Sequence, residues 1–92
     1  MGMDSIELVM EVEDEFAISL PDELLERCMV VGQLCDAVVQ TVRQNPTHPL
    51  NANADLQSYV FEHVRIITSK VCGVHTGDIQ RETRFNDDLH LD

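Results

Sequence analysis

Aromatic residues are scarce in this sequence. They make up 4% of its 92 residues, with no Trp, although apolar residues reach an ordinary 43%. The length is enough for one hydrophobic core and too short for two independently stable domains. The composition therefore predicts a single small domain whose core is built from aliphatic side chains.

Basic residues are also few. Six Lys and Arg stand against 17 Asp and Glu, for a formal net charge of −11. Residues 1–47 hold ten of these acids and two of the bases, a net charge of −8. Residues 48–92 hold the other seven acids and four bases, a net charge of −3. Such a surface repels nucleic acid and anionic membranes, and it favours protein partners with a basic docking face.

Long apolar runs are absent too. No segment approaches the roughly 20 apolar residues that cross a bilayer, and no basic stretch followed by an apolar one marks a signal peptide. We therefore expect a cytoplasmic or organelle-matrix protein.

Three cysteines form neither an even disulfide set nor a C-x-x-C pair. Cys28 and Cys35 stand among apolar neighbours, which predicts thiols packed as small hydrophobic side chains.

The segment from about residue 4 to Phe16 has the period of an amphipathic helix. Its apolar positions are predicted to form one buried stripe: Ile6, Leu8, Val9, Met10, Val12 and Phe16. Its acids fall on the opposite face: Asp4, Glu7, Glu11, Asp14 and Glu15. No Lys or Arg interrupts this acidic row, so it is either a solvated face or a docking surface for basic partners.

Three further helices are predicted. A short one begins at Pro21 and ends near Arg27, a clearly amphipathic one follows over residues 31–42, and another covers residues 56–71 and closes near Gly73. Residues 44–55 contain two prolines and no apolar period, as a linker does. The last residues are mostly loop, with four apolar anchors: Ile79, Phe85, Leu89 and Leu91. The fold class is all-α.

Metal binding and catalysis have little support in the sequence. The stretch NDDLHLD contains acids, but Leu89 and Leu91 stand where calcium ligands would be needed. The four histidines lack zinc-site spacing, and we expect them on the surface or half-buried. No phosphate-binding loop or catalytic constellation is present, so we expect neither a metal site nor a catalytic site. A small metal-dependent enzyme would require stoichiometric metal in the purified protein.

Several stretches resemble acyl carrier proteins. DSIELVMEVEDEFAISLPDE is similar to that family's acidic helix and the loop after it, and VVGQLCDAVVQTV to its last helix. LQSYVFEHVRIITSKVCGV is similar to the family's first helix, DIQRETRF to its long loop, and FNDDLHLD to the segment just before the modified serine. The family's second half thus matches residues 1–43 and its first half residues 56–92, with residues 44–55 as linker.

The resemblance implies a four-helix bundle, with three longer helices and one short one, in circularly permuted order or spanning two half-domains. The family's first helix runs antiparallel to the acidic and last helices. A linker of this length can join the two halves within one chain, or it can let two chains exchange halves as a domain-swapped dimer.

The resemblance also implies a prosthetic group. Acyl carrier proteins hold acyl chains as thioesters on a 4′-phosphopantetheine arm attached to a serine. In the family's register this serine position falls at Gly2, which has no hydroxyl, with Met3 and Asp92 at the neighbouring motif positions. Ser5 is the fallback attachment residue, although capping or solvent exposure is the simpler explanation for a serine at this position. The arm is therefore expected to be absent from this chain.

Two further sets of residues are implied by the resemblance. The positions that meet basic patches on partner enzymes are Asp4, Ile6, Glu7, Met10, Glu13 and Asp14. The positions that line the acyl-accepting core are Val9, Val12, Phe16, Leu20, Phe85 and Leu89. The expected partners are acyl-chain synthesis enzymes and phosphopantetheinyl transferase. The alternative is an acidic helical interaction module that keeps the carrier fold without the arm, which Gly2 supports.

Overall fold

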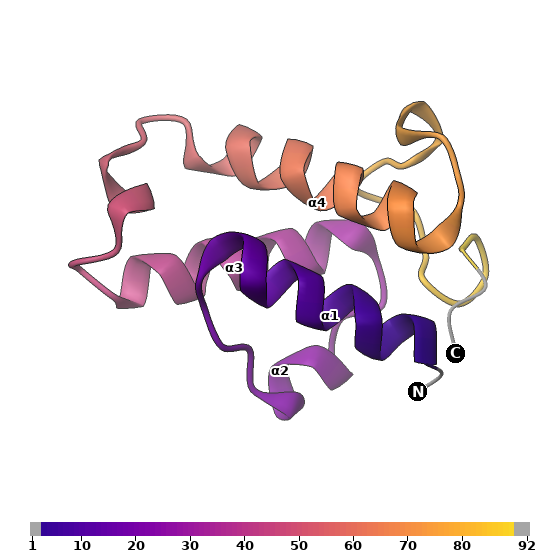
Figure 1. The fold of residues 1–92 in the computed structure, drawn as a ribbon, viewed down its shortest axis with the longest axis horizontal. Helices are drawn as coiled ribbons and strands as arrows, with labels where there is room; N and C mark the ends of the chain where they lie inside the picture. Colours follow the sequence, from indigo (N-terminus) through magenta and orange to yellow (C-terminus); the bar gives the residue numbers. More distant parts are fainter. Residues whose placement is uncertain (1–2, 90–92) are drawn as a thin grey trace.

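The computed structural model describes residues 3–89. For residues 3–5 it describes the helical backbone but not the side chains. This part of the chain forms α1 (Met3–Phe16), α2 (Asp22–Glu26), α3 (Val31–Gln44) and α4 (Leu56–Cys72). Two 3₁₀ turns, η1 (Pro49–Ala52) and η2 (Thr76–Asp78), lie in the connections around α4. Figure 1 shows α1 and α3 running in one direction and α4 antiparallel to both. The predicted all-α bundle of three longer helices and one short one is confirmed.

The inner face of α1 is narrower than its sequence predicts. Leu8, Val12 and Phe16 are buried at i, i+4 and i+8, whereas Ile6 and Met10 are 51% and 59% exposed. Each residue turns by about 100° around a helix, so six closely spaced apolar residues cannot share one face. The prediction that Ile6 and Met10 are buried is wrong, and both lie on the outer surface.

Helix α3 matches its predicted pattern closely. Its six predicted apolar positions are all buried: Val31, Leu34, Cys35, Val38, Val39 and Val42. They fall on one side of the helix and form a hydrophobic stripe that packs against α4 within the common core.

The antiparallel helix, α4, buries Leu56, Val60, Val64 and Ile67 against the same core. It ends at Gly73, whose φ of 70° is left-handed and whose N–H donates to the Ser69 carbonyl at 2.9 Å. This is the predicted C-terminal glycine cap.

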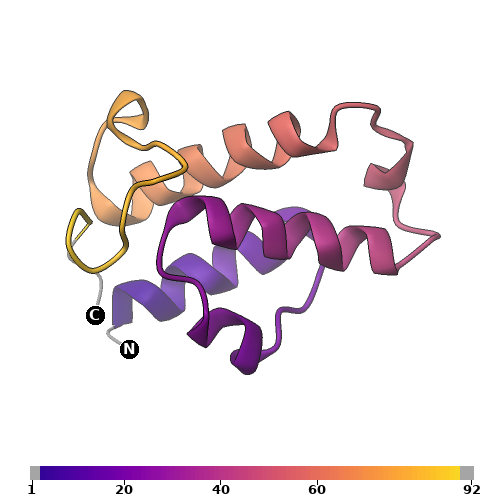
Figure 2. The ribbon, with the colours of Figure 1, turned by 180° about the vertical axis from the view of Figure 1, so that it is seen from behind.

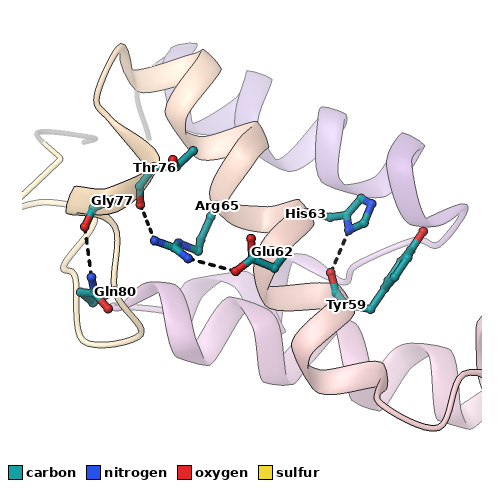
Figure 3. A network of polar contacts seen from close by, with 7 residues as sticks. All are labelled: Tyr59, Glu62, His63, Arg65, Thr76, Gly77 and Gln80. Carbon is teal, nitrogen blue, oxygen red and sulfur yellow. Dashed lines mark hydrogen bonds and ion pairs between the residues drawn. The ribbon is translucent and has the colours of Figure 1, made fainter.

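The outer side of α4 is tied to η2 by Arg65. Its guanidinium donates to the Thr76 carbonyl at 2.7 Å and to the Glu62 carboxylate at 3.0 Å, as Figure 3 shows. It also lies over the Phe61 ring, 5.0 Å from the centroid. The turn after α4 is therefore held back against the helix that precedes it.

The short helix α2 begins one residue later than predicted. Pro21 has a ψ of 144° and is the extended residue before the helix, which starts at Asp22. Arg27 follows the last helical residue and closes it. Five residues are too few for a stable isolated helix, so packing of Leu24 and Leu25 against the core holds α2 in place.

The connection between α3 and α4 contains a buried histidine, contrary to the expected surface or half-buried positions. His48 is 8% exposed, and its Nε2–H donates to the Phe16 carbonyl at 2.6 Å. Its Nδ1 accepts from the Leu50 N–H at 3.1 Å, so both ring nitrogens contact the backbone. The sequence shows no local signal for this contact, because Phe16 lies 32 residues away along the chain.

The loop after η2 caps the start of α3. The Arg81 and Thr83 carbonyls accept from the N–H groups of Gly32 and Val31 at 2.8 and 2.9 Å. These N–H groups have no partner within the helix itself. Figure 2 shows this segment passing over the start of α3. The Arg81 side chain adds an ion pair to Asp36 at 2.8 Å.

Residues 3–89 contain no β-strand. One isolated antiparallel bridge joins Val30 to Arg84, beside the loop that caps α3. Within the same residues, no helix combines the length and the apolar character needed to cross a membrane.

Cys35 is fully buried as predicted, and Cys28 is half-buried against the core. Burial raises the pKa of the Cys35 thiol to about 12. We expect Cys35 to react with iodoacetamide about a thousandfold more slowly than an ordinary thiol at about pH 8, because the thiolate is the nucleophile. The unfolded chain ionises first, so the stability contributed by this group falls as pH rises above about 8.5.

Pulsed alkylation followed by peptide mass spectrometry measures the rate at each cysteine. The same measurement in urea is the control, since there all three cysteines are expected to react. Equal Cys35 rates in buffer and in urea would contradict its burial.

Candidate functional site

The outer face of α1 is acidic and partly apolar. Glu7, Glu11 and Asp14 are exposed on it, together with Ile6 and Met10. No ion pair is found for these three acids within the described part of the chain. The face therefore carries free negative charge beside apolar side chains, a combination that suits a basic protein surface. Of the predicted partner positions, the Asp4 side chain lies outside what the structure describes.

Glu13 differs from the other predicted partner residues. It is half-buried, and its Oε2 accepts from the Leu20 N–H at 2.7 Å. The chain turns after α1 at Ala17, whose φ of 53° is left-handed, and Ile18 N–H donates to the Glu13 carbonyl at 3.1 Å. One Glu13 carboxylate oxygen is therefore engaged in holding the loop that follows α1.

The last turn of α1 is rich in acids although it is the negative end of the helix dipole. The structure explains two of them, Glu13 by its bond to Leu20 and Glu15 by its position opposite His63 on α4. The Glu15 Oε2 lies 4.0 Å from the His63 Nε2. These acids therefore serve tertiary contacts rather than local helix stability.

The predicted acyl-lining residues come together only in part. Val12, Phe16, Leu20 and Leu89 belong to one buried core, and Phe85 packs against it. Val9 is half-buried on α1. Acceptance of an acyl chain by this core remains a prediction.

Two open grooves lie near the end of α1 rather than in that core. One runs past Asp14, Ile18 and Thr41, and the other lies between Leu24 of α2 and Gln40 of α3. Neither groove is lined by any of the six predicted acyl-lining residues.

The predicted attachment region falls at the edge of the described chain. Gly2 and Asp92 lie outside the described residues, and so does the Ser5 side chain. The start of α1 and the loop that reaches Leu89 lie at the same end of the molecule (Figures 1 and 2). Leu8 and Leu89 share one hydrophobic core, so the last described loop returns to α1.

The two described acids of the NDDLHLD stretch, Asp87 and Asp88, are occupied within their own turn. The Asp88 carboxylate accepts from the Arg84 N–H at 2.8 Å, and Asp87 pairs with the Arg84 side chain at 3.0 Å. Among residues 3–89, no group of three or more potential metal-ligating side chains is clustered.

Part of the chain is similar to acyl carrier proteins. Those of Chlorobium phaeobacteroides, Chlorobium phaeovibrioides and Chlorobium luteolum are each 42% identical over 39 residues, which are 42% of this chain and 50% of the relative. The chain therefore spans about half the length of the curated relatives it matches. No protein-family model matches the chain, and no solved structure matches it.

The similarity covers 39 residues, so it shows a likeness to acyl carrier proteins in that part of the chain. Acyl carrier proteins are carriers and not enzymes, so the prediction of a protein without catalytic activity fits these relatives.

Proposed function

We propose that this chain is an acyl carrier-type domain in permuted order that serves fatty-acid or related lipid synthesis in the cytoplasm or an organelle matrix. The observation that carries the proposal is the similarity of part of the chain to acyl carrier proteins, within an all-α bundle of the expected helix lengths. The antiparallel orientation of α4 is the one that the resemblance implies for the family's first helix (Figure 1).

The prosthetic arm does not fit the residue at its expected position. Attachment of 4′-phosphopantetheine requires a hydroxyl, and Gly2 has no side chain to supply one. The start of α1 and the loop that reaches Leu89 lie at the same end of the molecule, which supports the proposed register, while Gly2 and Asp92 themselves lie outside the described residues (Figures 1 and 2). We therefore propose an acyl carrier domain that lacks only the attachment serine at this position, so that a serine introduced there should be modified.

The test restores the hydroxyl. We expect the chain as it stands to gain no mass with phosphopantetheinyl transferase and coenzyme A, and the Gly2→Ser variant to gain one phosphopantetheine group on intact-protein mass spectrometry. Gly2→Ala is the matched control, since it adds a side chain without a hydroxyl. A phosphopantetheine adduct mapped to Ser5 in the unaltered chain would overturn the alignment.

A second variant, with its segments in the order of the acyl carrier family, tests whether the chain is a permuted carrier or an interaction module without the arm. Residues 56–92 are joined directly to residues 2–43, without the linker, and Gly2→Ser is introduced, so that Asp92 precedes the new serine. Permutation predicts that this chain folds cooperatively and is modified. Modification of the serine variant in neither order, with both chains folded, would favour the alternative, an acidic interaction module with a carrier fold and no arm.

The acidic face gives a second prediction. We expect Glu7→Gln with Asp14→Asn to slow association with phosphopantetheinyl transferase about threefold or more at low salt, because rim charges steer encounter. Glu13 is left unchanged because its carboxylate holds the Leu20 N–H. Stopped-flow association rates at low and high salt measure the effect.

The matched control removes the same charge elsewhere. Glu23→Gln with Glu26→Gln neutralises two exposed acids of α2. An equal slowing by both pairs would show that net charge, rather than the α1 face, governs the encounter.

A further inference from the structure

His63 on α4 is held in one tautomer by its own helix. Its Nδ1 lies 2.8 Å from the Tyr59 carbonyl, as Figure 3 shows. A carbonyl oxygen can only accept, so the hydrogen of the neutral imidazole is on Nδ1. The Nε2 atom of the neutral ring then carries a lone pair and no hydrogen.

This unprotonated nitrogen faces a carboxylate of another helix. The Nε2 lies 4.0 Å from the Glu15 Oε2 on α1, with the two side chains 33% and 44% exposed. Two acceptors cannot form a hydrogen bond with each other. Protonation of Nε2 supplies both a donor and a positive charge, so the contact becomes attractive only in the imidazolium form.

A helix end and two aromatic rings surround His63. Glu15 stands in the last turn of α1, where the helix dipole attracts a cation. The Tyr59 ring is stacked on the imidazole, with centroids 4.0 Å apart and planes at 27°, which suits a cation over an aromatic face. The Phe16 ring meets His63 edge-on, with the ring centroids 6.2 Å apart.

The other charged groups near His63 are engaged elsewhere. Among the described residues, Glu15 is the one acid within 4.0 Å of the imidazole, from α1 or from any other element. On α4 itself, Glu62 and Arg65 pair with each other at 3.0 Å. The charge on His63 therefore acts mainly on α1.

His48 provides a contrast at the same end of α1. Its Nδ1 accepts from the Leu50 N–H, so protonation there would break a contact rather than form one. The two histidines that meet the last turn of α1 thus respond to a proton in opposite ways.

We propose that His63 forms a pH-dependent ion pair between α4 and the last turn of α1: the charged imidazole pairs with Glu15, and the neutral imidazole does not. This contact lies beside the one between Phe16 of α1 and Tyr59 of α4, so pH changes how strongly these two helices are held together. The ion pair does not depend on whether the chain carries a prosthetic group.

The test is a double-mutant cycle with Glu15→Gln and His63→Gln, with unfolding followed in urea. At about pH 5.5, where histidine is largely charged and carboxylates remain ionised, we expect the pair to change the unfolding equilibrium constant by about two- to fivefold. At about pH 8.5 we expect no coupling beyond error. Glu11→Gln, on the same helix, and His75→Gln, an exposed histidine, are matched controls that should show no pH-dependent coupling.

A spectroscopic readout keeps the proposal testable if the stability change is small. Long-range ¹H–¹⁵N spectra at about pH 8.5 should show the Nδ1–H tautomer for His63. Lowering the pH from about 8.5 to about 5.5, a range in which carboxylates stay largely ionised, should shift the Glu15 side-chain carboxyl resonance in the unaltered chain and not in His63→Gln. The Nε2–H tautomer, equal coupling at both pH values, or a Glu15 shift that survives His63→Gln would each overturn the proposal.

Discussion

Phe16→Ala is expected to lower the free energy of unfolding by about 3–5 kcal/mol, the usual cost of removing a buried Phe side chain. Phe16 is 1% exposed, and its ring meets those of Tyr59 and His63 edge-on at 6.4 and 6.2 Å. The substitution removes the contacts with both of these rings and leaves a cavity in the core. Urea unfolding followed by far-UV circular dichroism measures the loss.

Two further variants make this prediction decisive. Met10→Ala on the same helix removes a side chain that is 59% exposed, and its effect should stay within about 0.5 kcal/mol. If Phe16→Ala does not fold, Phe16→Leu should fold with a smaller loss. A loss for Phe16→Ala no larger than for Met10→Ala would contradict the burial of Phe16.

Gly32→Val is expected to lower the free energy of unfolding by about 1–3 kcal/mol, the usual cost of overpacking. A Cβ at Gly32 would lie 3.0 Å from the Arg81 carbonyl oxygen and 3.2 Å from the Arg81 Cβ. That carbonyl also accepts the Gly32 N–H at 2.8 Å, so the added side chain pushes away the loop that caps α3. Urea unfolding, with hydrogen exchange at Val31 and Gly32, measures both effects.

Gly77→Val is the matched control for this change. A Cβ at Gly77 would meet nothing within 4 Å, so the same side chain is added into open space. Its effect should be clearly smaller and should leave exchange at the start of α3 unchanged. Equal losses for the two variants would indicate that the cost is that of replacing a glycine and not of displacing the loop.

Periodicity was the most reliable guide to the fold. All six apolar positions predicted for α3 are buried, and Gly73 ends α4 as predicted. The pattern of α1 was less specific. Its apolar residues spread over more of the helix surface than the part that packs in the core, so Ile6 and Met10 stay exposed. Residue type alone does not tell which side of such a cluster the neighbouring helices will occupy.

The candidate site was predictable only where it depends on one helix. The exposure of Glu7 and Asp14 follows from the pattern of α1, whereas the bond between Glu13 and Leu20 depends on how the chain turns at Ala17. The similarity to acyl carrier proteins supports part of the resemblance found in the sequence. The permuted order and the role of Gly2 remain proposals.

The order of residues is enough to predict where the helices form, which faces of α3 and α4 enter the core and where the acidic charge lies, because these depend on side chains along a regular backbone. The contacts between polar groups depend instead on the tertiary fold: His48 with the Phe16 carbonyl, Gly32 with Arg81, and His63 with Glu15. Such contacts join segments that are distant along the chain. Their partners are set by the docking of whole helices and loops, which no local pattern of residues encodes.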